Sequence, residues 1–112
     1  MTDFPIDVLL IEDDPGDARL IREMLLSDGS GMFALTQCAY LESGMTALDE
    51  QAYDVILLDL TLPDSAGIDT LFQLQSAVPD VAIVVLTGLD DMTLVGVEAV
   101  KAGAQDFLVK GE

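Results

Sequence analysis

The sequence has few basic residues, a single cysteine and no histidine, and each of these features excludes some functions or cellular locations. Only 4 of its 112 residues are Lys or Arg, against 21 Asp or Glu, which gives a net charge of -17 at pH 7. A surface this negative repels nucleic acid and anionic membranes, and it attracts cations and basic protein surfaces. The domain is therefore not expected to bind nucleic acid or membranes, although solubility or a salty cytoplasm would explain many of the acids equally well.

The cysteine content and the apolar runs indicate a cytoplasmic location. The single cysteine, Cys38, has no partner for a disulfide within the chain, which fits a reducing compartment. Because there is no histidine to activate its thiol, Cys38 is interpreted as a small core residue and not as a nucleophile. The N-terminus lacks the features of a signal peptide, and the longest apolar run, residues 81–89, is too short to cross a membrane.

The chain has the size of one domain, and 51% of its residues are hydrophobic, enough to form a core. It shows no internal repeat, linker or low-complexity segment. Apolar runs predict strands at residues 6–11, 33–39, 53–59, 81–87 and 106–110. Between them, helices are predicted at residues 15–27, 42–50, 68–77 and 90–103, and a loop at 62–67. This alternation predicts a parallel sheet with helices on both faces, and continuous apolar strands fit it.

Polar residues end or directly follow four of the predicted strands, at the edge where open α/β sheets bind ligands. These strand-end residues are Glu12, Asp13, Asp14, Asp59, Thr87 and Lys110. A group of carboxylates repels itself unless a hard cation such as magnesium lies among them. A lysine and a hydroxyl beside one carboxylate suit a phosphoryl group, and the carboxylate can itself be the nucleophile. The pattern therefore predicts that Asp59 attacks phosphorus.

Each of these residues also has an ordinary structural interpretation. Asp14 followed by Pro15 is typical of an N-cap and the first position of a helix. The other acids can be loop or turn residues, the threonine can satisfy a strand end, and the lysine can be an exposed side chain. Taken singly, these interpretations are at least as good as a functional one. They do not explain why these residue types occur together at four strand ends.

Four segments resemble, in order and spacing, the motifs of the receiver domain of two-component response regulators: VLLIEDDPGD, VILLDLTLPDSAG, VVLTG and DFLVK. The resemblance covers nearly the whole chain. It implies a flavodoxin-like α/β fold, a doubly wound five-stranded parallel sheet of order 2-1-3-4-5. It also implies a signalling switch that accepts a phosphoryl group from a sensor histidine kinase or a phosphotransfer protein with Mg²⁺. Such a domain has only slow self-catalysed phosphotransfer and dephosphorylation, and is not an enzyme in the usual sense.

The same resemblance implies individual roles. Asp59 would be the phosphoacceptor, and Asp13 would bind the metal directly while Glu12 acts mainly through a bound water. The complete implied metal set is Glu12, Asp13, Asp59 and the backbone carbonyl of Thr61. The residues implied to contact the phosphoryl group are Thr87 and Lys110. Phe107 is the implied switch aromatic, which changes rotamer as Thr87 moves.

The sequence departs from the family pattern at its end. Gly111 follows Lys110 where the family usually has proline, and the sequence ends before the position of the family's final helix, which is therefore expected to be absent from this chain. The receiver domain is therefore expected to span residues 1–112, with no output domain visible. Without that helix, apolar side chains of the strands that it would cover are expected to be exposed. This exposure is expected to promote association between copies of the chain, for example as a homodimer.

Three other functions share part of this pattern with the receiver domain. A phosphatase of the haloacid dehalogenase type also uses an Asp nucleophile and magnesium, but it needs a second acid two residues later, where Thr61 stands. A nucleotide- or flavin-binding domain is disfavoured because no glycine-rich loop follows the first strand. A receiver-like protein-interaction module that works without phosphorylation stays open as the alternative.

Overall fold

The computed structural model of this chain describes residues 5–27, 31–87, 98 and 100–109. Five strands form one sheet, in which all neighbouring strands run parallel. They are β1 (Ile6–Ile11), β2 (Phe33–Cys38), β3 (Val55–Asp59), β6 (Ala82–Thr87) and β7 (Asp106–Val109). Their order across the sheet is β2-β1-β3-β6-β7. Because β6 and β7 are the fourth and fifth strands of this sheet, the predicted order 2-1-3-4-5 is confirmed.

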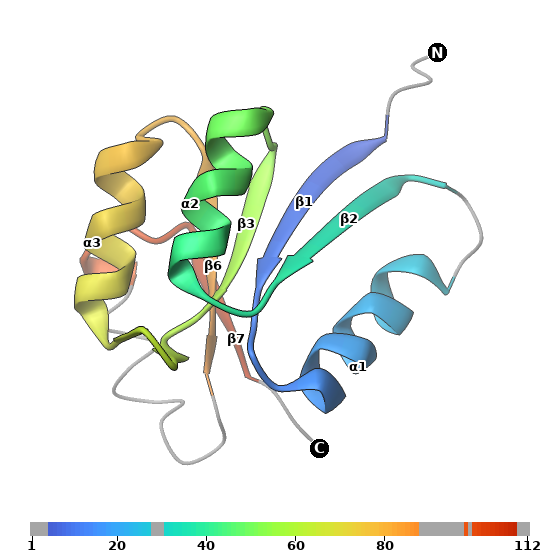
Figure 1. Cartoon of the computed structure of the whole chain (residues 1–112), viewed down its shortest axis with the longest axis horizontal. Coiled ribbons are helices and arrows are strands. Elements are labelled where there is room, and N and C mark those ends of the chain that lie inside the picture. Colours follow the sequence, from blue (N-terminus) through green and yellow to red (C-terminus); the bar gives the residue numbers. More distant parts are fainter. Residues whose placement is uncertain (1–4, 28–30, 88–97, 99, 110–112) are drawn as a thin grey trace.

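Helices cover both faces of the sheet (Figure 1): α2 (Leu41–Glu50) and α3 (Ile68–Ala77) lie on one face, and α1 (Pro15–Leu26) lies on the other. Alternate side chains of β1 supply both cores. Leu9 and Ile11 pack in the cluster that includes residues of α2 and α3, whereas Val8 and Leu10 pack in the cluster that includes residues of α1. From Val8 to Ile11 both faces of β1 are buried, which explains why these four residues are all apolar. Within the described residues, no helix is long and apolar enough to cross a membrane.

Most predicted boundaries agree with the structure to within two residues, and those of β1 and α3 agree to the residue. The segment 62–67, predicted as a loop, instead holds most of a small antiparallel hairpin of β4 (Thr61–Leu62) and β5 (Ser65–Ala66). Two residues per strand are too few for an alternating pattern to be visible in the sequence. The predicted helix 90–103 lies mostly outside the described residues. Residues 98, 100 and 101 are helical, and Gly103 follows with φ of 115°, as expected of a helix C-terminus.

Helix α2 lies close to β1 at Gly44. A Cβ atom at this position would lie 2.6 Å from Cδ1 and 3.1 Å from Cγ1 of Ile11, whose side chain is fully buried. Ile11 directly precedes the acidic residues that follow β1, so the small size of Gly44 lets α2 pack onto the end of the strand that carries them.

Replacing Gly44 with Ala should therefore destabilise the fold by about 1–3 kcal/mol, because the added methyl group overpacks the core. The higher helix propensity of Ala offsets at most about 1 kcal/mol of that loss. Gly16→Ala in α1 is the matched control, since its Cβ would meet its nearest neighbour at an ordinary 3.7 Å. Urea unfolding measures both variants. A Gly44→Ala variant as stable as the wild type would contradict this packing.

Candidate functional site

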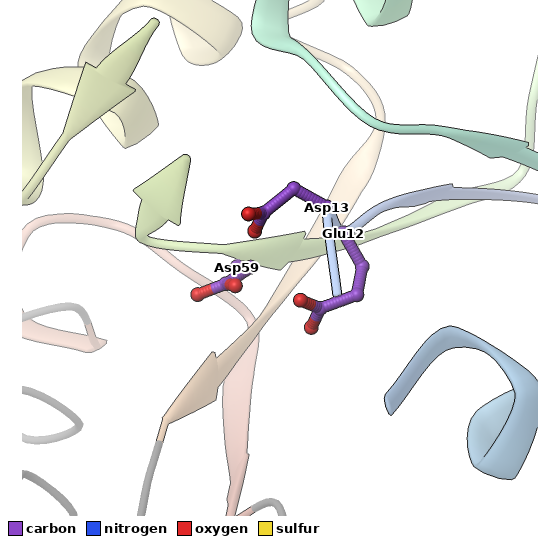
Figure 2. Close-up of side chains that lie close together, drawn as sticks. All are labelled: Glu12, Asp13 and Asp59. Carbon is purple, nitrogen blue, oxygen red and sulfur yellow. The ribbon is translucent and has the colours of Figure 1, made fainter. Parts of the chain in front are cut away.

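Three carboxylates converge at the carboxyl ends of two neighbouring strands (Figure 2). Glu12 and Asp13 directly follow β1, and Asp59 is the last residue of β3. The strands pair in register, with Ile11 opposite Leu58, so the residues that follow lie side by side at one edge. One carboxylate oxygen from each of the three acids lies within 4.8 Å of the others. The structure thus brings together three of the predicted site residues, 47 positions apart in the case of Glu12 and Asp59.

The cluster is mostly shielded from water. Glu12 is 0% exposed and Asp59 is 5% exposed, whereas Asp13 is exposed. Two like charges about 4 Å apart repel by about 1 kcal/mol in water and by about 4 kcal/mol at the lower effective dielectric typical of partly buried groups. Three carboxylates in this arrangement therefore favour a cation among them.

Backbone groups fix the directions of the two buried carboxylates. The amide of Asp14 donates to Oε2 of Glu12 at 3.1 Å, and the amide of Thr61 donates to Oδ1 of Asp59 at 2.9 Å. The Glu12 backbone is itself anchored to β2, because its amide donates to the Cys38 carbonyl and its carbonyl accepts from Gln37 Nε2. Backbone hydrogen bonds therefore hold the carboxylates of Glu12 and Asp59 in place.

The donor set suits a hard divalent cation. Carboxylate oxygens are the ligands that magnesium and calcium prefer, and magnesium is commonly bound through one or two carboxylates with water at the remaining positions. Two buried carboxylates and one exposed carboxylate within 4.8 Å of one another offer oxygens on the protein side and access on the solvent side. The residues present therefore fit a divalent metal ion.

The other predicted site residues are described only in part. Thr87 is the last residue of β6, the strand next to β3, and Phe107 on β7 is partly buried against the core cluster beside α3. Thr61 is exposed and begins the hairpin that follows Asp59. Lys110 lies outside the described residues. The backbone places Thr87 at the same edge of the sheet as the acids.

The structural interpretation of two further residues is confirmed. Asp14 is the N-cap of α1, and its Oδ1 accepts from the amide of Gly16 at 3.2 Å. Cys38 packs against the core cluster, and burial raises the pKa of its thiol above the usual 9.0 even though a hydrogen bond with Ser43 lowers it. A thiol with a raised pKa is a poor nucleophile at neutral pH, which agrees with its interpretation as a core residue.

Sequence reasoning missed the contacts that hold the hairpin after Asp59. Asp64 accepts hydrogen bonds from two backbone amides at the start of α2, and the hydroxyls of Ser65 and Thr70 are 2.6 Å apart. The first contact joins residues more than 20 positions apart, so no local spacing reveals it. The one available signal was Tyr40, since a tyrosine at an N-cap position leaves the helix to be capped by another side chain.

A doubly wound five-stranded sheet with three acids at the ends of β1 and β3 defines a flavodoxin-like domain, and the acids form a candidate cation site at the edge where such sheets bind ligands. The family model for the response regulator receiver domain matches residues 8–112. The chain belongs to this family, and it is a receiver domain of two-component response regulators, a signalling module and not a conventional enzyme.

Curated relatives are regulators with additional parts. The chain is 39% identical over 103 residues to the cell cycle transcriptional regulator CtrA of Caulobacter vibrioides, covering 92% of this chain and 43% of that protein. It is 30% identical over 113 residues to the transcriptional regulatory protein ZraR of Escherichia coli, covering 98% of this chain and 24% of that protein. The chain thus spans less than half the length of these relatives.

Solved structures show the same fold. A response regulator receiver domain protein from Clostridium thermocellum superposes with a TM-score of 0.79 at 26% identity, covering 96% of this chain and 83% of that one. A putative response regulator from Chloroflexus aurantiacus superposes with a TM-score of 0.83 at 22% identity, covering 96% and 86%.

Proposed function

We propose that this receiver domain accepts a phosphoryl group on Asp59 from a phosphohistidine of a sensor histidine kinase or a phosphotransfer protein, with Mg²⁺ bound beside it. The observation that carries the proposal is the convergence of Asp59 with Glu12 and Asp13 at one edge of the sheet. A lone aspartate there could be a turn residue. An aspartate that shares a shielded site with two other acids has the surroundings of a metal-assisted nucleophile.

In the proposed transfer, an oxygen of the Asp59 carboxylate forms a bond to phosphorus. The bond between phosphorus and the donor imidazole nitrogen breaks, and the imidazole leaves with the electron pair. The amide of Thr61, which donates to Asp59 Oδ1, holds the carboxylate in a fixed direction for this attack. Magnesium, when bound, spreads the negative charge that gathers on the phosphoryl oxygens and the acids.

The remaining roles in this proposal are those that the resemblance to the receiver family implies. Asp13, Asp59 and the Thr61 carbonyl would hold the metal directly, and Glu12 would act mainly through a bound water. Thr87 and Lys110 would contact the phosphoryl oxygens. Phe107 follows the movement of Thr87 by changing rotamer, which carries the switch towards β7. The aspartyl phosphate is then lost by slow attack of water.

The partners and the cellular location of this domain are part of the same proposal. A net charge of -17 favours a basic protein partner over nucleic acid, and the cytoplasm is the compartment of the proposed kinase partner. The longer relatives support attachment to an output domain that the phosphorylated receiver controls. Association of two copies is also part of the proposal, since symmetric dimers are the commonest form of oligomer.

The wild-type chain should gain the mass of one phosphoryl group when it is incubated with Mg²⁺ and a small phosphodonor such as acetyl phosphate. Removal of the metal with EDTA should prevent the gain, because the acids would then repel the incoming anion. Intact mass spectrometry measures uptake directly. A chain that binds magnesium but gains no mass would contradict the proposal and favour a module that acts without phosphorylation.

A further inference from the structure

The N-cap residue of helix α2 does not cap the helix with its own side chain. That residue is Tyr40, whose side chain makes no cap hydrogen bond, and Ser43 reaches back so that its Oγ accepts from the Tyr40 amide at 3.3 Å. The amides of Leu41 and Glu42 donate instead to Asp64, at 2.9 Å to Oδ1 and 3.0 Å to Oδ2. Both oxygens of one carboxylate, supplied from another part of the chain, thus satisfy the first two amides of α2.

Asp64 belongs to the segment that follows Asp59. It lies in the turn between β4 and β5, where Thr61 pairs with Ala66 and Leu62 pairs with Ser65. The hairpin is closed at its base by the Gly67 amide, which donates to the Leu60 carbonyl at 2.7 Å. The Thr61 amide then donates to the Asp59 carboxylate. A continuous set of hydrogen bonds therefore runs from the start of α2, through the hairpin, to Asp59.

The other strand of the hairpin is anchored separately. Ser65 Oγ lies 2.6 Å from Oγ1 of Thr70, a residue of α3 that is fully buried. The hairpin is consequently attached to α2 at its turn and to α3 through β5. Of these two attachments, only the one through Asp64 connects the hairpin to α2. Helix α2 in turn packs at Gly44 against Ile11, the residue that directly precedes Glu12 and Asp13.

The charge of Asp64 agrees with this role. The backbone hydrogen bonds from Glu42 and Leu41 hold the pKa of the Asp64 carboxyl below its ordinary value of 3.8. The start of a helix carries a partial positive charge that attracts an anion. Asp64 is therefore ionised at neutral pH, and both of its oxygens can accept hydrogen bonds.

We propose that Asp64 is a positioning residue for the acidic site. By tying the start of α2 to the β4–β5 hairpin, it fixes the Thr61 backbone against Asp59 and so sets the affinity of the site for magnesium. The proposal rests on the proposed function only in taking magnesium as the ion of this site. Asp64 itself touches neither the metal nor the phosphoryl group in this role; it acts through the backbone that it holds.

The test compares Asp64→Ala and Asp64→Asn with Ser43→Ala. Ser43→Ala is the matched control, because it removes the local cap of the same helix and leaves the hairpin untouched. Calorimetric titration with MgCl₂ should show Kd raised on the order of 10-fold in Asp64→Ala, the range seen when residues that orient metal ligands are removed. Asp64→Asn keeps one oxygen acceptor and should fall between Asp64→Ala and the wild type. Ser43→Ala should lower Tm and leave Kd unchanged.

Hydrogen exchange without metal provides a second readout. The amides of residues 60–67 should exchange faster in Asp64→Ala than in the wild type, whereas in Ser43→Ala they should exchange at the wild-type rate. If Kd and these exchange rates are the same in Asp64→Ala and Ser43→Ala, Asp64 is a helix cap only and the inference is overturned. If Asp64→Ala does not fold, Asp64→Asn decides by the same comparison. A wild type that binds magnesium but takes no phosphoryl group counts against the proposed function alone.

Discussion

Asp59→Asn should gain no mass with Mg²⁺ and a phosphodonor under conditions where the wild type gains one phosphoryl group. The amide has nearly the same shape as the carboxylate, so the fold is retained, but it has no anionic oxygen with which to form the bond to phosphorus. We therefore expect complete loss of uptake and not a partial reduction. Intact mass spectrometry over a time course measures this result.

Asp54→Asn is the control for that experiment. Asp54 lies just before β3, at the opposite end of the strand from Asp59, and its Oδ2 accepts from the Asp7 amide at 2.8 Å. Asparagine retains an oxygen that can accept this bond, so the variant should fold and take up phosphate as the wild type does. Uptake that persists in Asp59→Asn, or that disappears in Asp54→Asn, would place the phosphoacceptor elsewhere.

Magnesium should raise the melting temperature of the wild type by a large amount. A ligand at a hundred times its Kd stabilises the native state by about 2.7 kcal/mol. For a domain of this size that corresponds to a rise on the order of 10 °C. The physical cause is relief of the repulsion among Glu12, Asp13 and Asp59. Asp13→Asn should reduce the rise, because it removes the exposed carboxylate of the cluster.

General screening must be separated from binding at the site. With a net charge of -17, any added salt reduces the overall repulsion within the chain and stabilises the fold somewhat. Melting curves in NaCl of matched ionic strength measure that part, and Asp49→Asn, which removes an exposed acid of α2, gives the matched charge change away from the cluster. If Asp13→Asn and Asp49→Asn respond alike to magnesium, and NaCl has the same effect, the cluster does not bind the ion.

The pattern of the sequence was sufficient to predict a parallel sheet with helices on both faces and acids at its strand ends, whereas the strand order 2-1-3-4-5 came from the resemblance to the receiver family. β1 and α3 were bounded to the residue, since an apolar run and a helical period each end abruptly at polar or proline-containing segments. The convergence of Glu12 and Asp59 followed from topology alone, because parallel strands present their carboxyl ends at one edge.

What the sequence could not reveal are contacts between residues with no shared pattern. Nothing near Asp64 in the sequence indicates that it caps a helix beginning 23 residues earlier. Similarly, Gly44 is only a residue of low helix propensity in the sequence, and its role becomes clear from its close contact with Ile11 in the structure. The hydroxyl pair of Ser65 and Thr70 is similar, since Thr70 occupies a fully buried position where an apolar residue would be expected. These details need three-dimensional neighbours.

The position of β1 between β2 and β3 has a consequence for synthesis of the chain. β1 ends at residue 11 but pairs with β3, which ends at residue 59, so a nascent chain carries an apolar strand with one unpaired edge until β3 emerges. At ordinary rates of translation this interval lasts about 2–10 s. Parallel pairing through distant segments is also slow to form. The negative charge of the many acids would then make neighbouring nascent chains repel one another until β3 pairs with this edge of β1.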